Sequence, residues 1–204
     1  MPEARYRRIA DDIRHRIANG EWRTGESLPS RRVMAGEYGV HHETVNLAYT
    51  LLRRTGALEG EERKQVVVAH PPAVRTLTDA DAVWPYSSET TDTRPRPATE
   101  ELAERLGVPV RTMLQHETVE CLDPGGRSAL LASTWWRGRR QPHVAFSAEL
   151  DVVPLGADQA HALGLLVDTL ALRVVRTRLD AHGTPVETAD LILPMDRWRI
   201  RLSG

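Results

Sequence analysis

Polar side chains that could read DNA bases are grouped at residues 41–46, His-His-Glu-Thr-Val-Asn. Asn46 carries the donor and acceptor pair that suits adenine, and His42 can donate to a guanine acceptor or to a phosphate. Because these two residues lie four positions apart, they would share one face of a helix. Glu43 can accept a hydrogen bond from cytosine, but a negative charge also suits the first turn of a helix, and we slightly favour this second role.

The sequence shows few signs of metal binding, cofactor binding or catalysis. The adjacent His41 and His42 would not face each other on a helix, and no acid or cysteine at ligand spacing completes a metal site. The sequence has no nucleophile elbow, no phosphate-binding glycine loop and no HExxH motif. We therefore predict no metal, no cofactor and no catalytic residue.

Two short helices must position residues 41–46. The first begins at Ser30, whose hydroxyl can cap the free amides, and runs to a tight turn at Gly39. The second starts near His41 and ends at Gly56, and its apolar face consists of Val45, Ala48 and Leu52. This layout is typical of a helix-turn-helix, whose second helix enters the major groove, and also of an ordinary helical hairpin. Spacing alone leaves these interpretations close to even.

The residues around the two helices favour the first interpretation. They resemble the winged helix-turn-helix of the GntR family over about residues 5–68, at Tyr6, Ile9, Ala10, Ile17 to Gly20, Gly25, Leu28 to Ser30, Arg32, Ala35, Gly39, Val40, Thr44, Val45, Ala48, Leu52 and Gly56. The resemblance implies a bacterial transcription regulator that binds double-stranded DNA, at a palindromic operator, as a homodimer. The DNA contacts that we predict from it are Ser30, Arg32, His41, His42, Thr44, Asn46 and Lys64.

These predicted contacts differ in kind. Arg32 stands where the first-helix arginine of the family contacts DNA, and Ser30 is more a helix cap than a contact. The family usually has arginines where this chain has His42 and Asn46. We therefore expect an altered base preference, because asparagine suits adenine and arginine suits guanine.

The wing of the resemblance follows the second helix. Residues 57–59 and 65–68 predict two strands joined by a tip that holds two acids beside Arg63 and Lys64. Either base could reach a phosphate or a narrow minor groove. The family usually has a smaller, glycine-rich tip, so docking of the wing stays open.

Composition limits the class of protein. The 204 residues suffice for one large domain or two small ones, and the single cysteine, Cys121, excludes an internal disulfide and fits a reducing cytoplasm. No apolar run reaches the roughly 18 residues of a membrane span, so we expect a cytoplasmic protein without membrane contact. Residues 1–70 hold 12 Lys and Arg against 10 Asp and Glu, so any positive patch must be local.

A composition change marks the domain boundary. Residues 71–97 are rich in Pro, Thr, Ser and Asp and show little apolar periodicity, which predicts a proline-stiffened linker. Trp84 and Tyr86 could anchor it to a neighbouring domain. We therefore assign residues 1–70 to the DNA-binding domain, 71–97 to the linker and 98–204 to a second domain.

The second domain contains an internal duplication. A shift of 57 residues places Leu106-Gly107-Val108 over Leu163-Gly164-Leu165 and Leu122-Asp123 over Leu179-Asp180. Each copy predicts one helix, at 99–106 or 157–163, and a two-stranded hairpin, 113–122 with 128–136 or 169–179 with 185–193. Two such copies predict an α+β domain built around an antiparallel sheet.

This half resembles the UTRA effector domain of the HutC-type branch of the family, a fold related to chorismate lyase. The clearest match is Gly183–Asp190 followed by Leu193–Arg197, and the segment Arg137–Asp151 between the copies is short for the family. Members that bind phosphorylated sugars often carry arginines in the first long strand, where this chain has Thr118 and Glu120. A sugar phosphate is therefore disfavoured as the effector.

The resemblance implies a pocket for a small molecule. The aromatic and polar residues that we assign to it are His116, Ser133, Trp135, Arg173 and Glu187. Trp135 and Trp136 must point to opposite faces of a strand, so at most one of them lines a pocket.

The whole chain is thus interpreted as a GntR/HutC-like repressor under small-molecule control. Two alternatives stay open: an enzyme or ligand carrier with the chorismate-lyase-like fold and a vestigial DNA head, and a regulator that has lost ligand control and works through protein contacts.

Overall fold

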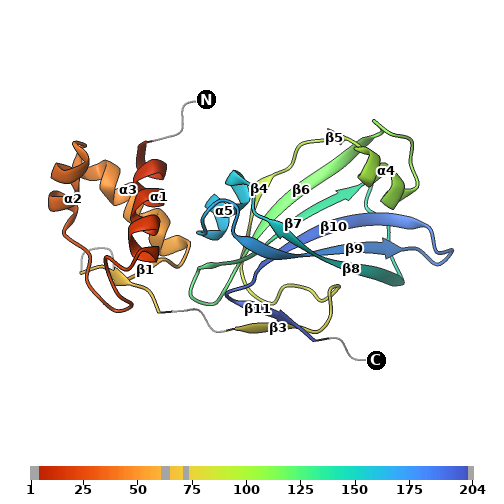
Figure 1. Cartoon of the computed structure of the whole chain (residues 1–204). Helices are drawn as coiled ribbons and strands as arrows, with labels where there is room; N and C mark the ends of the chain where they lie inside the picture. The colour runs from red at the N-terminus through yellow and green to blue at the C-terminus, as the bar shows by residue number, and fades with distance from the viewer. Residues whose placement is uncertain (1–4, 61–64, 71–73, 202–204) are drawn as a thin grey trace. The chain divides into compact units, whose positions relative to one another are not determined.

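The computed structural model describes residues 5–60, 65–70 and 74–201 (Figure 1). The chain divides into two compact units. The first consists of residues 1–72 with 126–128 and 155–169, and the second consists of residues 73–125, 129–154 and 170–204.

Three helices and a small hairpin form most of the first unit. They are α1 (Arg5–Ala18), α2 (Arg31–Tyr38), α3 (His42–Arg54), β1 (Leu58–Glu59) and β2 (Val67–Val68). The two strands pair antiparallel, with Leu58 opposite Val68. These elements agree with the predicted winged helix-turn-helix. Arg63 and Lys64, in the predicted wing tip, lie outside the described residues.

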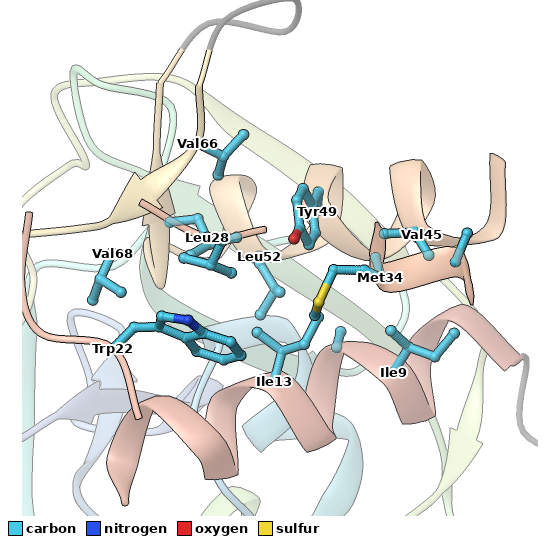
Figure 2. Close-up of a cluster of buried hydrophobic side chains, with 14 residues drawn as sticks. Ile9, Ile13, Trp22, Leu28, Met34, Val45, Tyr49, Leu52, Val66 and Val68 are labelled. Atoms are coloured by element: carbon cyan, nitrogen blue, oxygen red, sulfur yellow. The ribbon is translucent and has the colours of Figure 1, made fainter. Parts of the chain in front are cut away.

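Figure 2 shows the apolar core that holds these helices together. Apolar residues recur every three or four positions on α1 and α3, so each helix presents one continuous apolar face. The labelled core side chains are Ile9, Ile13, Trp22, Leu28, Met34, Val45, Tyr49, Leu52, Val66 and Val68. Each large apolar side chain buried in this way stabilises the fold by roughly 1.5–3 kcal/mol.

A seven-stranded antiparallel sheet dominates the second unit. Its path is β4-β6-β7-β10-β9-β8, and β5 also pairs with β6. The strands are β4 (Ser88–Asp92), β5 (Arg96–Pro97), β6 (Met113–Leu122), β7 (Ser128–Trp136), β8 (Ala145–Pro154), β9 (Leu170–Leu179) and β10 (Pro185–Pro194). A separate parallel pair joins β3 (Arg75–Leu77) to β11 (Trp198–Ile200). Helix α4 (Glu100–Leu106) follows β5, and α5 (Ala157–Leu163), which follows β8, belongs to the first unit.

The structure confirms the internal duplication and extends it. Helices α4 and α5 begin 57 positions apart, as do β6 and β9, and β4 and β8. Two halves of the sheet, β4-β6-β7 and β10-β9-β8, therefore meet at the β7-β10 pair in mirrored order. Even backbone detail is repeated, because Arg111 and Asp168 are equivalent residues and both have positive φ, 68° and 65°.

The predicted linker, residues 71–97, needs correction. Residues 75–97 contain β3, β4 and β5, which pair with β11 and β6 and so belong to the second unit. The prediction failed because β4, Ser-Glu-Thr-Thr-Asp, is almost wholly exposed and lacks the apolar alternation that marks a half-buried strand. Backbone pairing with β6, rather than side-chain burial, makes it a strand.

One long strand was also missed. Residues 145–154, which overlap the segment 137–151 between the two copies, form β8, and β8 pairs with β9 along ten residues. In the described part of the chain, no helix is long and apolar enough to cross a membrane.

Candidate nucleic-acid interface

Local capping fixes the geometry of the two helices. The hydroxyl of Ser30 accepts a hydrogen bond from the Val33 amide at 3.4 Å and caps α2. Gly39 ends α2 in the left-handed region with φ 61°, which a side chain would disfavour. His41 caps α3, because its Nδ1 accepts from the Glu43 amide at 3.4 Å. The sequence predicted Ser30 and Gly39 in these roles, but not His41 as a cap.

The two faces of α3 differ sharply. Val45, Ala48, Tyr49 and Leu52 are buried against the core, whereas His42, Glu43, Leu47 and Thr50 are exposed, and Thr44 and Asn46 are half-buried beside them. His42 Nε2 lies 3.2 Å from Glu43 Oε1, so the acid of the first turn already has a cationic partner when His42 is protonated. The exposed face therefore offers hydrogen-bonding side chains to a ligand, and the Glu43 carboxylate lies beside the His42 ring.

An exposed leucine on this face was not predicted. Leu47 is 52% exposed although it lies on a helix whose core face is complete. An apolar side chain in the major groove can contact the methyl group of thymine. No periodicity marks such a residue, since it falls between the buried positions.

Two neighbouring arginines at the start of α2 have different surroundings. Arg31 is half-buried, with its guanidinium 6.0 Å from the centre of the Tyr49 ring. Arg32 is exposed in the same turn and so can reach a ligand. At the end of α3, Arg53 donates to the Gly60 carbonyl at 3.4 Å and thereby joins α3 to the base of the wing.

In the second unit, three of the predicted effector residues lie together on one face of the sheet. The His116 and Trp135 rings stack with their centres 5.1 Å apart. Thr118 Oγ1 lies 3.2 Å from His116 Nε2 and 3.1 Å from Ser133 Oγ. Trp135 also packs against the apolar cluster of α4. The Trp135 ring therefore holds α4 against the sheet.

Arg173 lies on the same face of the sheet, where it belongs to a network of ion pairs. Arg105 of α4 donates to Asp190 at 2.6 Å, and Arg173 Nε lies 3.4 Å from the other Asp190 oxygen. Both arginines also contact the Glu101 carboxylate. The hydrogen bond from Arg173 is the main reason why the pKa of Glu101 is lowered. The network ties α4 to β9 and β10.

Glu187, the fifth predicted effector residue, lies on the opposite face. It pairs in register with Trp136, whereas its neighbour Thr188 pairs with Trp135. Its carboxylate accepts from Arg178 at 2.8 Å and from Arg176 at 3.3 Å. The predicted set is therefore divided between two faces. The same register confirms that Trp135 and Trp136 point in opposite directions.

A cavity of about 390 Å³ opens beside α4, on the face that carries Trp135. None of the five predicted effector residues lines it; the lining residues are Glu101, Glu104, Arg105, Ser147, Glu149, Asp151, Val175, Thr177, Leu179 and Pro185. Four carboxylates against one arginine make it an acidic cavity. Of these lining residues, only Glu101 and Arg105 are marked by local spacing, because opposite charges four positions apart on a helix lie side by side.

Metal and thiol chemistry find little support in this geometry. Within residues 5–60, 65–70 and 74–201, no three His, Cys, Asp or Glu side chains are grouped to hold a metal ion. Burial raises the pKa of the Cys121 thiol to about 11, so this cysteine is protonated and unreactive near neutrality.

Comparison with known proteins identifies the first unit. Residues 5–68 match the family model of the bacterial regulatory proteins of the gntR family. Residues 5–68 are a GntR-family helix-turn-helix domain. Over nearly its whole length the chain is also similar to the uncharacterized HTH-type transcriptional regulator RB1450 of Rhizobium meliloti (strain 1021). The two are 26% identical over 236 residues, which cover 99% of this chain and 96% of the relative.

Two further proteins are similar to this chain, one in its GntR domain and one in its overall fold. The GntR domain is 43% identical over 54 residues to MngR, the mannosyl-D-glycerate transport/metabolism system repressor of Escherichia coli K12, and this match covers 26% of the chain and 22% of the relative. The crystal structure of PhnF from Mycobacterium smegmatis matches 96% of the chain and 98% of that protein, with a TM-score of 0.52 and 20% identity. The latter shows the fold alone, and it confirms the predicted α+β class. The GntR domain and the similarity to a transcriptional regulator over nearly the whole chain support the regulator interpretation over the enzyme alternative.

We expect Arg32→Ala to weaken DNA binding by the GntR domain without unfolding it. An exposed arginine adds little to the core, whereas a contact with a base edge contributes about 1–3 kcal/mol, or roughly 5- to 150-fold in affinity. Fluorescence anisotropy with a selected operator measures the loss, and Arg23→Ala, which removes the same charge from an exposed loop, is the control. Equal affinity of the two variants would exclude Arg32 from the interface.

We expect the second unit of this chain to lose stability in acid through His116. Burial is the largest cause that lowers the pKa of His116 below its ordinary 6.5. The unfolded chain therefore takes up the proton first, and stability present above about pH 6.5 is lost as the pH falls through this window. His116→Gln should lose less stability than the natural chain between pH 7.5 and 5 in urea unfolding. The exposed His182→Gln variant should show the natural loss, and identical losses in all three proteins would contradict the prediction.

Proposed function

We propose that this GntR-type regulator represses transcription in the cytoplasm by binding a palindromic operator as a homodimer. The observation that carries the proposal is the two-sided α3, which has a fully buried apolar face and an exposed polar face behind a capped turn. Residues 1–70 bind DNA, and residues 98–204, together with the strands of 75–97, bind an effector and dimerise. Dimerisation doubles the small positive charge of one DNA-binding domain.

The exposed face of α3 reads the major groove. Asn46 pairs with adenine, His42 donates to a guanine acceptor or to a phosphate, and Leu47 contacts a thymine methyl. Arg32 contacts a base edge beside this helix, and the helix starts, at Ser30 and His41, bind the backbone on either side. The half-site that fits this set is richer in A·T pairs than one read by two arginines.

The effector binds beside α4. The acidic cavity supports a neutral or cationic small molecule, because a phosphorylated ligand would meet four carboxylates and one arginine. Arg173 and Asp190 lie behind Glu101, so a ligand that displaces Glu101 shifts α4 relative to β9 and β10. Such a ligand controls DNA binding only if it prefers one arrangement of the dimer over another.

Selection of DNA fragments by the purified chain tests the function. Random double-stranded fragments are incubated with the protein, recovered and sequenced over several rounds. We expect enrichment of an inverted repeat, because two identical heads read two half-sites. A matched selection with Arg32→Ala should enrich the repeat weakly. Absence of any enriched sequence would favour the alternative of an enzyme or ligand carrier with a vestigial DNA head.

A further inference from the structure

Strand β8 is a long, exposed edge of the main sheet. It ends the path β4-β6-β7-β10-β9-β8, pairs on one side with β9, and nine of its ten residues are exposed. Apolar side chains lie on one face at every second position: Val144, just before the strand, is 72% exposed, Phe146 39%, Leu150 49% and Val152 55%. Ala148 lies at the centre of this row. Exposed apolar edges of this length promote association, and proteins usually protect them.

The equivalent edge in the other half of the duplication is protected. Strand β4 lies 57 positions before β8 and at the opposite end of the sheet path, but it has only five residues, all of them polar. Its register shifts between Thr90 and Asp92, and an irregularity of this kind twists an edge away from further pairing. Two edges with the same origin therefore differ in length, polarity and regularity. This difference indicates that β8 has a partner.

We infer that a second copy of this chain pairs with β8 along its free edge, antiparallel, about a twofold axis at Ala148. This inference rests on the dimer of the proposed function and assigns its interface. The axis places Ala148 opposite itself, Phe146 opposite Leu150 of the second copy and Val144 opposite Val152. All of the exposed apolar residues in the row are then paired across the strands. The two sheets become one continuous sheet.

The acidic residues on the other face of β8 select this register. With the axis at Ala148, Glu149 faces Ser147 of the second copy and Asp151 faces Ala145. An axis at residue 149 would place Glu149 opposite Glu149 of the second copy. An axis at residue 150 would place Glu149 opposite Asp151 of the second copy. Like charges directly opposite each other destabilise a sheet. An axis at residue 147 avoids these contacts but moves Val152 beyond the partner strand.

A single introduced cysteine tests this pairing in the full chain. At the axis the two copies of residue 148 have Cα atoms about 4.5–5.5 Å apart, which suits a disulfide. Ala148→Cys should therefore give a covalent dimer on mild oxidation with diamide, seen on a non-reducing gel. Natural Cys121 is buried, so it adds no background. Val152→Cys is the matched control, because its two copies would lie about 27 Å apart along the paired strands.

We expect Ala148→Cys to cross-link at least tenfold faster than Val152→Cys, and the natural chain to sediment as a dimer. Equal rates, or faster cross-linking of Val152→Cys, would overturn the register and the inference. A monomeric natural chain would overturn both the edge pairing and dimeric operator binding. The edge pairing of β8 and the proposed DNA-binding function can also be refuted independently of each other. A dimer that enriches an inverted repeat without cross-linking at residue 148 would refute only the edge pairing, and a cross-linked dimer that enriches no DNA would refute only the function.

Discussion

Replacing Asn46 with arginine is expected to change the half-site of this regulator from A·T to G·C at one position. Asparagine offers the donor and acceptor that match adenine, whereas arginine offers two donors that match guanine. Each correct pair discriminates by about 1–3 kcal/mol, so the preference between the two bases should move by roughly twice that amount. Asn46 is half-buried on the exposed side of α3, and Arg32 stays unchanged in the variant. Selection on half-sites randomised at each position measures the change.

A charge-matched variant separates base reading from electrostatic attraction. Asn19→Arg adds the same charge at an exposed site after α1 and should raise affinity for all sequences equally. The Asn46→Arg variant should instead gain affinity for one base and lose it for another. If both variants enrich the natural half-site, Asn46 does not read the operator.

Truncating Tyr49 is expected to cost the GntR domain about 3–5 kcal/mol, the usual loss for a large buried aromatic residue. Tyr49 is 1% exposed at the centre of the core in Figure 2, and its hydroxyl donates to the Pro29 carbonyl at 2.8 Å. Tyr49→Ala therefore leaves a cavity between α3 and the loop that leads into α2. Urea unfolding followed by circular dichroism at 222 nm should show the helical transition at a much lower midpoint. DNA binding should be lost with it.

Two further substitutions define the origin of this loss. Tyr49→Phe keeps the ring and removes only the hydrogen bond, so it should cost about 0.5–1.5 kcal/mol. Tyr86→Ala removes a tyrosine that is 45% exposed and should leave the helical transition unchanged. A small effect of Tyr49→Ala, close to that of Tyr86→Ala, would mean that the core does not hold α3 in place.

The sequence by itself determined the DNA-binding half. Ser30, Gly39 and the apolar spacing of α3 act within a few residues of chain, through caps, a left-handed turn and one buried helical face. Such local signals depend little on distant parts of the molecule. Most of the strands of the duplication were predicted for the same reason, because their apolar and β-branched runs are continuous.

Only the tertiary structure decided the rest. The strand character of β4 comes from pairing with β6, since its five residues are all polar and mostly exposed, whereas β8 has apolar residues at every second position and pairs with β9. Which face Glu187 and Trp135 occupy follows from register, and a shift of one residue would exchange the faces. The acidic cavity joins α4 to β8 and β9, whose residues lie up to about eighty positions apart along the chain. Contacts over such distances leave no mark in local spacing, because each partner is specified only by the geometry of the finished sheet.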